Sequence, residues 1–600
     1  MQDLRISRLR DAYRSNRLSP TALVNEIFDR IEASSDENIW ISLVPRARAL
    51  ERAAELERAG AAAGALPLFG VPFGVKDNID VAGLPTTAGL PAPIHVPEHS
   101  APVVNRLITA GAIVIGKTNL DQLACGLVGT RSPYGVPRNP HNAEYVPGGS
   151  SSGSAVAVSR GLVSFALGTD TAGSGRVPAG FNGLVGLKPS PGLLSTRGVV
   201  PACRSLDCVS VFALDVPDAT EVADLARGYD DEDPWSRKAA DSVSFTAGES
   251  MDAPRLGIPR ADQLEFFGDT RARAAYERAL ERFRAQGAEL APLDFAPLFE
   301  VAQFLYSGPW LAERVTVLDA LPAQPLLPVL REIFSEADRY DARDAFRSQH
   351  HLMLLSRRVE RIWSSYDALL VPTSPTIYTI DQIEREPRLY NSRLGLYTNF
   401  VNLLRLAAIA VPNGVRDDGL PTGITLIGPC DGDAKLARLA HRYHTEASRG
   451  AHESMPGERP ASSSDTAEKQ GLSRLAVVGA HLTGQPLNHE LTRLGARLVR
   501  ACRTSACYQL YALTGTTPAK PGLVRSTDEQ GHAIEVEVFE LTAAALGAFM
   551  NSVRAPLCIG TIALEDGSTV LGFLCEAHAL ASAREISQFG GWRAYLKSLA

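Results

Sequence analysis

Two clusters of glycine and serine, with a lysine further upstream, are the residues of this chain whose types and spacing suit chemistry. The clusters, Gly148–Ser154 and Gly168–Ala179, lie within Pro147–Pro191 on either side of an apolar segment. Small residues let the backbone approach other groups closely, and successive N–H groups in such loops can form a nest for a negatively charged oxygen. A phosphate loop needs G-x-x-x-x-G-K-[ST], which is absent, and a flexible linker does not contain a segment such as FALGTD. The pattern therefore indicates a structured site.

The two clusters resemble those of the amidase signature family. The family carries GGSSGGS and GTDTGGSIRIPA, followed by CGLVGLKPT, and this chain has GGSSSGS at 148–154, GTDTAGSGRVPA at 168–179 and GLVGLKP at 183–189. The family's lysine motif also occurs, as GVPFGVKDN at 70–78. The resemblance covers roughly residues 1–445 and departs at Ser152, Ala172 and Gly175. It implies an α/β fold, with a mixed β-sheet flanked by helices.

The resemblance implies a catalytic triad of Ser174, Ser150 and Lys76. An amide carbon is a poor electrophile, so covalent catalysis needs an activated oxygen nucleophile. Ser174 is the implied nucleophile, Ser150 the proton relay after a cis peptide bond, and Lys76 the base. None of the three motifs contains a histidine. A lysine can act as the base only if its pKa falls from ~10.4 to about 7–8, and burial disfavours its charged form.

The turn before Ser174 is expected to stabilise the oxyanion that develops during the reaction. A turn of small residues can aim several backbone N–H groups at one oxygen. The groups expected to do so belong to Thr171, Ala172, Gly173 and Ser174. Asp170 and Arg176, on either side of this turn, are interpreted as a local ion pair that braces it, in preference to a catalytic pair.

Two further segments resemble one subfamily, the allophanate hydrolases. They are LLSTRGVVPACRSLDCVSV at 193–211 and YSGPWLAER at 306–314. The resemblance implies that Tyr306 and Arg314 contact the substrate. Allophanate is a urea that carries a carboxylate, which a planar guanidinium matches through two parallel hydrogen bonds. The alternative is an amphipathic helix with Trp310 in the core and Arg314 on the surface.

The C-terminal part of the chain is expected to form a separate domain. Residues 446–471 are rich in Ser, Glu, Gly and Pro, which is typical of a linker. Residues 472–600 contain several strand-like runs, which predict an α+β or small-barrel domain. They resemble the allophanate hydrolase C-terminal domain, which has a γ-glutamylcyclotransferase-like fold. His481 follows a predicted strand and is a candidate for assisting a decarboxylation; a packed or surface histidine is an equal alternative.

The function hypothesis is hydrolysis of the terminal amide of allophanate. Ser174 attacks the carbamoyl carbon, ammonia leaves, and water releases N-carboxycarbamate, which yields carbon dioxide and further ammonia. No metal and no organic cofactor are expected. The alternatives are a short-chain amidase, the A subunit of a tRNA-dependent amidotransferase, or an inactive amidase fold that serves as an interaction module. The intact Lys76, Ser150 and Ser174 speak against the last of these.

Composition narrows the class of partner. A net charge of −7 and a pI near 6.0 argue against a nucleic-acid surface. No apolar run reaches the ~18–20 residues of a membrane span, and the polar N-terminus is not a secretory signal. Eight cysteines in 600 residues are too sparse for a disulfide framework. We therefore expect a cytoplasmic enzyme, a homodimer by family analogy, associated with a urea carboxylase or with s-triazine-degrading enzymes.

The elements that must position the site follow from hydrophobic periodicity. Ser19 and Pro20 predict the start of an amphipathic helix. Thr270–Gln286 predicts another helix, with an apolar face. Short apolar runs separated by Gly and Pro predict strands, and their alternation with helices predicts an α/β domain around a mixed sheet. The clearest of these runs are Ala112–Ile115, Leu256–Ile258, Ala368–Val371 and Ile424–Ile427.

Overall fold

The computed structural model divides into two compact units, Met1–Ser448 and Arg449–Ala600. It describes residues 2–34, 37–60, 65–238, 245, 253–306, 308–453, 472–526, 531–550, 552–566 and 568–599. Helix α17 (Asp433–Glu453) extends into the range 446–471 that the sequence suggests as a linker. The rest of that range, residues 454–471, lies outside the described residues.

The larger unit contains a mixed sheet of 11 strands, in the order β1-β3-β2-β4-β6-β5-β10-β11-β9-β7-β8. The expected α/β architecture is confirmed, and the four apolar runs lie in β3, β7, β9 and β11. The strands are β1 (Trp40–Leu43), β2 (Pro72–Lys76), β3 (Ile113–Thr118), β4 (Phe165–Asp170), β5 (Val185–Lys188), β6 (Cys208–Ala213), β7 (Arg255–Pro259), β8 (Glu289–Leu293), β9 (Ala368–Pro372), β10 (Ala407–Val415) and β11 (Pro421–Gly428).

Strands β2 and β4 are adjacent and parallel, and this brings two of the sequence motifs together. Val75 pairs with Leu167 in the ladder, so the lysine motif and the second glycine–serine cluster end at the same edge of the sheet. All residues of both strands are buried. Active sites of open α/β sheets commonly lie beyond the carboxyl ends of such strands.

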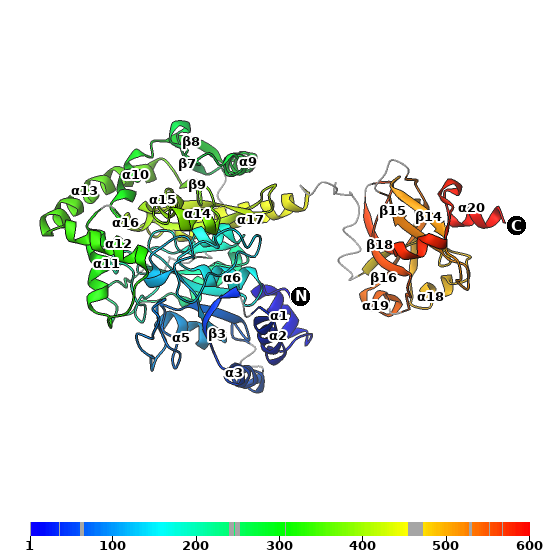
Figure 1. Ribbon diagram of the computed structural model, residues 1–600, viewed down its shortest axis with the longest axis horizontal. Helices are drawn as coiled ribbons and strands as arrows, with labels where there is room; N and C mark the ends of the chain where they lie inside the picture. The colour runs from blue at the N-terminus through cyan, green and yellow to red at the C-terminus, as the bar shows by residue number, and fades with distance from the viewer. Residues whose placement is uncertain are drawn as a thin grey trace. The chain divides into compact units, whose positions relative to one another are not determined.

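Helices cover the sheet and supply much of its core. Ser19 caps α2 by accepting a hydrogen bond from the Ala22 N–H at 3.2 Å, as its position before Pro20 predicts. Figure 1 shows α1, α2 and α3 together at the blue end of the chain. The helices on this framework are α1 (Ile6–Arg14), α2 (Pro20–Ala33), α3 (Arg46–Arg58), α5 (Pro102–Thr109), α6 (Ser152–Ser159), α7 (Val177–Phe181), α8 (Val216–Ala226), α9 (Thr270–Ala285), α14 (Ile380–Arg385), α15 (Leu389–Leu394), α16 (Phe400–Leu403) and α17.

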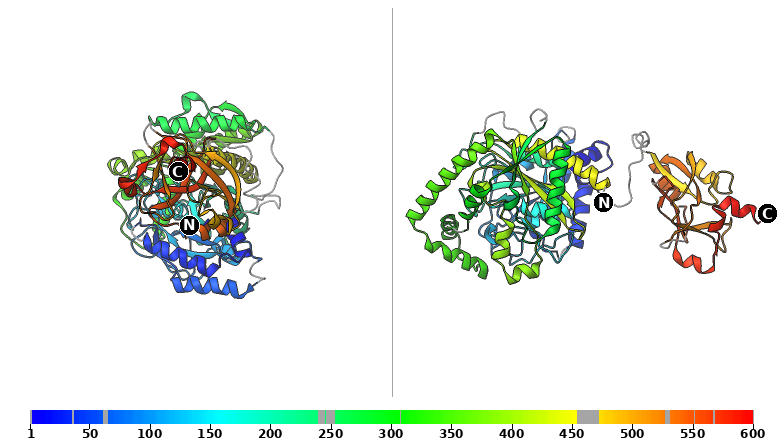
Figure 2. Two further views of the ribbon diagram at one scale, coloured as in Figure 1. Left: turned by 90° about the vertical axis from the view of Figure 1, so that its right-hand side faces the viewer. Right: turned by 90° about the horizontal axis from the view of Figure 1, so that it is seen from above.

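Four further helices form a group between β8 and β9. They appear in green at one end of the larger unit in Figures 1 and 2. An apolar cluster beneath them includes Leu298, Val301, Leu355 and Phe400, so the group packs through its own core. The helices are α10 (Ala296–Gln303), α11 (Trp310–Asp319), α12 (Pro328–Ser335) and α13 (Ala342–Glu360).

The smaller unit contains a five-stranded sheet, in the order β13-β16-β12-β18-β17, and a three-stranded sheet, β15-β14-β19. Its core is a separate apolar cluster that includes Val477, Val538 and Trp592. The elements are β12 (Leu472–Val477), α18 (Asn488–Thr492), β13 (Arg497–Arg503), β14 (Tyr508–Ala512), β15 (Pro521–Arg525), β16 (Glu535–Thr542), α19 (Ala543–Met550), β17 (Leu557–Ala563), β18 (Thr569–Cys575), β19 (Arg584–Glu585) and α20 (Trp592–Lys597).

None of the helices in the described part of the chain combines the length and hydrophobicity that a membrane-spanning segment requires. The same residues include no group of three or more His, Cys, Asp or Glu side chains placed to hold a metal ion.

Candidate active site

Lys76, the last residue of β2, is fully buried. Its Nζ lies 2.8 Å from the Oγ of Ser150 and 2.7 Å from the Oγ1 of Thr169. Burial lowers the pKa of Lys76 from 10.5 to about 7, because an ammonium is poorly solvated in the interior. Nearby carboxylates oppose this shift, namely Asp121, Asp207 and Asp170. At neutral pH a substantial fraction of Lys76 is therefore the free amine.

Ser150 and Ser174 contact the two ends of one segment, 121–126. The Ser150 carbonyl accepts a hydrogen bond from the Asp121 N–H at 3.0 Å, and the Ser174 hydroxyl donates to the Gly126 carbonyl at 3.5 Å. Both serines are buried, with 0% and 3% of their surface exposed. The Gly149–Ser150 peptide bond is cis, as the family resemblance implies. The lysine motif and both serine clusters thus meet around one small volume.

The turn that carries Ser174 is braced by a buried ion pair. Arg176 Nε lies 2.8 Å from Asp170 Oδ2, and both side chains are fully buried. Asp170 also accepts hydrogen bonds from the N–H groups of Gly173, at 2.9 Å, and Gly175, at 3.1 Å. One carboxylate therefore ties both sides of the turn to the end of β4, and the structural interpretation of this pair is confirmed.

Three of the four backbone groups proposed for an oxyanion are available. The Gly173 N–H is already directed at Asp170. Within the described residues, the N–H groups of Thr171, Ala172 and Ser174 donate no hydrogen bond. Gly173 has a φ of 130°, and a Cβ there would collide with the Thr398 hydroxyl, so glycine is required to shape the turn.

Segment 121–131 is part of the site, although the sequence motifs did not point to it. The buried carboxylate of Asp121 accepts hydrogen bonds from the N–H groups of Gly129, at 3.0 Å, and Arg131, at 2.9 Å. Leu123 and Ala124 adopt positive φ angles of 53° and 52°, which are uncommon for residues other than glycine. A carboxylate soon after a buried strand and before two glycines is the signal that could have revealed this loop.

Asp207 is a second residue that the motifs missed. It accepts a hydrogen bond from the Thr171 hydroxyl at 2.5 Å and another from the Ala202 N–H at 2.8 Å. Burial raises the pKa of Asp207 from 3.8 to about 6. Its charge acts on both Lys76 and Arg314. Because Asp207 interacts electrostatically with both, it links the proposed base to the guanidinium expected to bind substrate.

Arg314 lies in the first turn and a half of α11 and is only 3% exposed. The alternative that places this side chain on the surface is therefore wrong. Its guanidinium carbon lies 5.1 Å from the centre of the Tyr306 ring, and its Nε has no hydrogen-bond partner among the described residues. Burying a charged donor without a partner costs free energy unless a ligand compensates it. This buried cation is therefore a site for a small anion.

His481 belongs to the smaller unit and is enclosed by aromatic rings. It is 8% exposed, its ring stacks on Phe573 at 5.1 Å, and its Nε2 lies 3.0 Å from a Glu490 oxygen. Burial lowers its pKa, although the Glu490 carboxylate opposes this. The neutral form is thus favoured near pH 7. These contacts fit a packing role and also leave a neutral imidazole next to a carboxylate.

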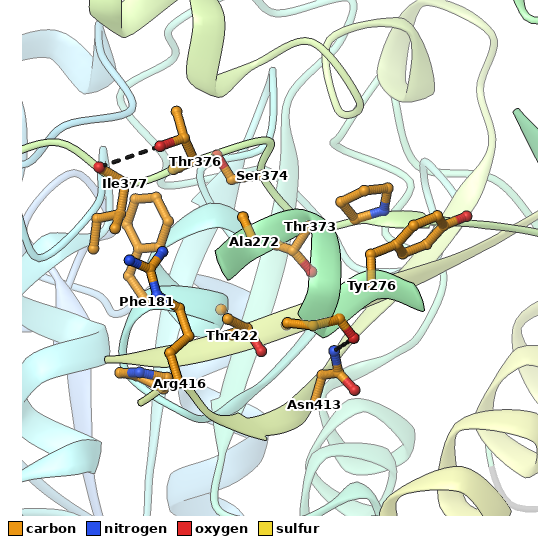
Figure 3. A pocket seen from close by; sticks show the side chains of 15 residues that line it. Phe181, Ala272, Tyr276, Thr373, Ser374, Thr376, Ile377, Asn413, Arg416 and Thr422 are labelled. Atoms are coloured by element: carbon orange, nitrogen blue, oxygen red, sulfur yellow. Dashed lines mark hydrogen bonds between the residues drawn. The ribbon is translucent and has the colours of Figure 1, made fainter. Parts of the chain in front are cut away.

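A separate pocket lies beyond the helix that follows Ser174 (Figure 3). Its lining includes Phe181 of α7, Tyr276 of α9 and Thr373 after β9. Arg416, which also lines it, is paired with Asp269 at 2.9 Å and with Asp418. None of the triad residues lines this pocket, and its cation is already neutralised, so the chemistry of the site lies elsewhere.

Comparisons with known proteins agree with this geometry. The family model described as Amidase matches residues 22–437, and the model described as Allophanate hydrolase C-terminal domain matches residues 473–597. The solved structure of Kluyveromyces lactis allophanate hydrolase is 39% identical, with a TM-score of 0.69 and 99% of each chain covered.

Two curated proteins extend the comparison. The Saccharomyces cerevisiae urea amidolyase is 42% identical over 595 residues, which are 96% of this chain but only 32% of that protein. A glutamyl-tRNA(Gln) amidotransferase subunit of Symbiobacterium thermophilum is 36% identical over 412 residues, 63% of this chain and 83% of that protein. The chain belongs to the amidase family, and an allophanate hydrolase C-terminal domain follows its amidase domain.

Proposed function

We propose that the chain hydrolyses the terminal amide of allophanate with Ser174 as nucleophile, Ser150 as proton relay and Lys76 as base. The observation that carries the proposal is the buried Lys76 amine, which lies 2.8 Å from the Ser150 hydroxyl and has a pKa of about 7. A base with a pKa near the working pH is the most effective, because it is both available and basic enough.

The proposed reaction proceeds through an acyl-enzyme. Ser174 Oγ attacks the carbamoyl carbon while its proton passes to Ser150 and the Ser150 proton passes to Lys76. The oxyanion accepts hydrogen bonds from the N–H groups of Thr171, Ala172 and Ser174. The protonated Lys76 then returns a proton through Ser150 to the leaving nitrogen, and ammonia departs. Water attacks the acyl-enzyme by the same proton route and releases N-carboxycarbamate.

Arg314 supports the choice of a carboxylate-bearing amide as substrate. Its guanidinium is buried and incompletely paired, and the phenol of Tyr306 lies next to it. A carboxylate that replaces the missing partner gains two charge-assisted hydrogen bonds. The similarity to the K. lactis allophanate hydrolase over 99% of both chains favours allophanate over other amides with a carboxylate.

The proposal extends to the surroundings of the reaction. We propose a homodimer in the cytoplasm that receives allophanate from a urea-carboxylating partner. The urea amidolyase relatives support this link, but the chain spans only about a third of their length. His481 of the smaller unit remains a candidate for assisting decarboxylation of N-carboxycarbamate, since its imidazole lies beside Glu490.

Ammonia release from four substrates tests the proposed function. Purified full-length protein is assayed with allophanate, malonamate, urea and glutamine. We expect rapid turnover of allophanate, slower turnover of malonamate, and little of urea, which lacks the carboxylate. Glutamine turnover above that of allophanate would instead support an amidotransferase-type activity, to which the relative from S. thermophilum points. Absence of turnover with all four would support an inactive amidase fold.

A further inference from the structure

Glu313, the residue before Arg314, is fastened to a loop of the catalytic region. Its Oε1 accepts a hydrogen bond from the Ser205 N–H at 2.8 Å, and its Oε2 accepts one from the Ser205 hydroxyl at 2.6 Å. The Cys203 thiol donates to the same Oε2 at 3.2 Å. One carboxylate therefore receives three donors from two residues of the loop. Such charge-assisted bonds are shorter and stronger than bonds between neutral groups.

The same loop reaches the turn of the nucleophile only two residues later. Asp207 accepts a hydrogen bond from the Thr171 hydroxyl at 2.5 Å, and its carboxylate also receives the N–H groups of Ala202 and Cys203. Thr171 begins the turn that ends at Ser174. Segment 202–207 is thus hydrogen-bonded at one end to the turn of the nucleophile and in its middle to the helix that carries Arg314.

We propose that Glu313 is a positioning residue that fixes the distance between Arg314 and Ser174, and that this distance selects substrates by the separation of amide and carboxylate. The inference rests on the proposed function, because it assumes that Arg314 binds the substrate carboxylate. In allophanate and malonamate a single atom separates the amide carbon from the carboxylate carbon. Succinamate has two, so a fixed distance rejects it.

Substitution of Glu313 by glutamine disturbs the anchor without a large change in shape. The amide group presents one NH₂ in place of an oxygen. Each carboxylate oxygen of Glu313 now accepts from a donor, so at either position the NH₂ meets the Ser205 N–H or the pair formed by the Ser205 hydroxyl and the Cys203 thiol. The first turn of α11 is then free to shift, and Arg314 shifts with it.

The experiment measures kcat and KM for malonamate and succinamate in full-length variants. Glu313→Gln and Ser205→Ala are the test variants, and Arg314→Ala reports on the proposed substrate contact. Glu300→Gln is the matched control, because Glu300 lies on the neighbouring α10 and pairs with His351 at 3.0 Å at the surface. Thermal unfolding checks that each variant folds, and Ser205→Ala tests the anchor independently if Glu313→Gln does not fold.

We expect the malonamate-to-succinamate ratio of kcat/KM to fall at least about tenfold in Glu313→Gln and Ser205→Ala, mainly through KM for malonamate, because a misplaced contact raises the barrier steeply. Glu300→Gln keeps the wild-type ratio. If both test variants keep the ratio while Arg314→Ala loses it, the positioning role is overturned and the proposed function stands. If Arg314→Ala also keeps the ratio, the proposed substrate contact itself fails.

Discussion

Lys76 is the residue on which the proposed chemistry depends, and its titration should be visible in the activity. Burial lowers its pKa to about 7, while the facing carboxylates Asp121, Asp170 and Asp207 keep it from falling further. Only the neutral amine can accept the proton, so kcat/KM should rise with pH and level off above about 7. A pH–rate profile of the free enzyme measures this value directly. A limb near pH 10 would show that Lys76 is not the base.

Loss of either the nucleophile or the base should remove nearly all activity. Ser174→Ala deletes the attacking oxygen, and Lys76→Ala deletes the group that takes up its proton. Since residues that act as one unit lose their function together, each variant should fall by about 10³-fold or more in kcat. Steady-state ammonia assays measure the effect, with circular dichroism as a check of folding. Retention of more than a few per cent of wild-type kcat in a folded variant contradicts the triad.

At the scale of elements, the segments on either side of Ser150 fit together with no space to spare. A Cβ on Gly149 would collide with the Asp121 carboxylate and would lie 2.5 Å from the Gly129 nitrogen. Gly149→Ala should therefore destabilise the protein by about 1–3 kcal/mol and displace Ser150, with a loss of activity. Gly547→Ala is the control, because a Cβ there meets nothing within 4 Å. Thermal melts and kcat of the two variants make the comparison, and equal behaviour would refute the argument.

Local sequence patterns predicted much of this framework. The cap at Ser19, the buried strands and the ion pair of Asp170 with Arg176 each depend on residues close in the chain, which periodicity and motif spacing can reveal. Asp121 and Asp207 escaped notice because their roles depend on partners that only the sheet brings near them. Arg314 illustrates the same limit. Its spacing on a helix fits a surface position, and the packing of α10–α13 is what buries it.

At the scale of the whole molecule, every residue of the proposed amide chemistry lies in the larger unit. A fragment of residues 1–453 should fold and retain about half or more of the ammonia release from allophanate, because each unit has its own apolar core. Carbon dioxide is followed separately in the fragment, in the full chain and in His481→Asn. Carbon dioxide that lags behind ammonia in the last variant would assign His481 a chemical role. Equal rates in all three proteins would leave the smaller unit a supporting role.

The position of α10–α13 has a consequence for how this scaffold can diversify. The triad is drawn from neighbouring parallel strands and the turns between them, whereas Tyr306 and Arg314 belong to a long excursion between β8 and β9. Insertions or replacements in that excursion leave the register of β2 and β4 untouched. Evolution can therefore exchange the recognition module while it keeps the hydrolytic engine. For an engineer, grafting a different 296–360 segment onto the same sheet is the most economical route to an amidase with a new acyl preference.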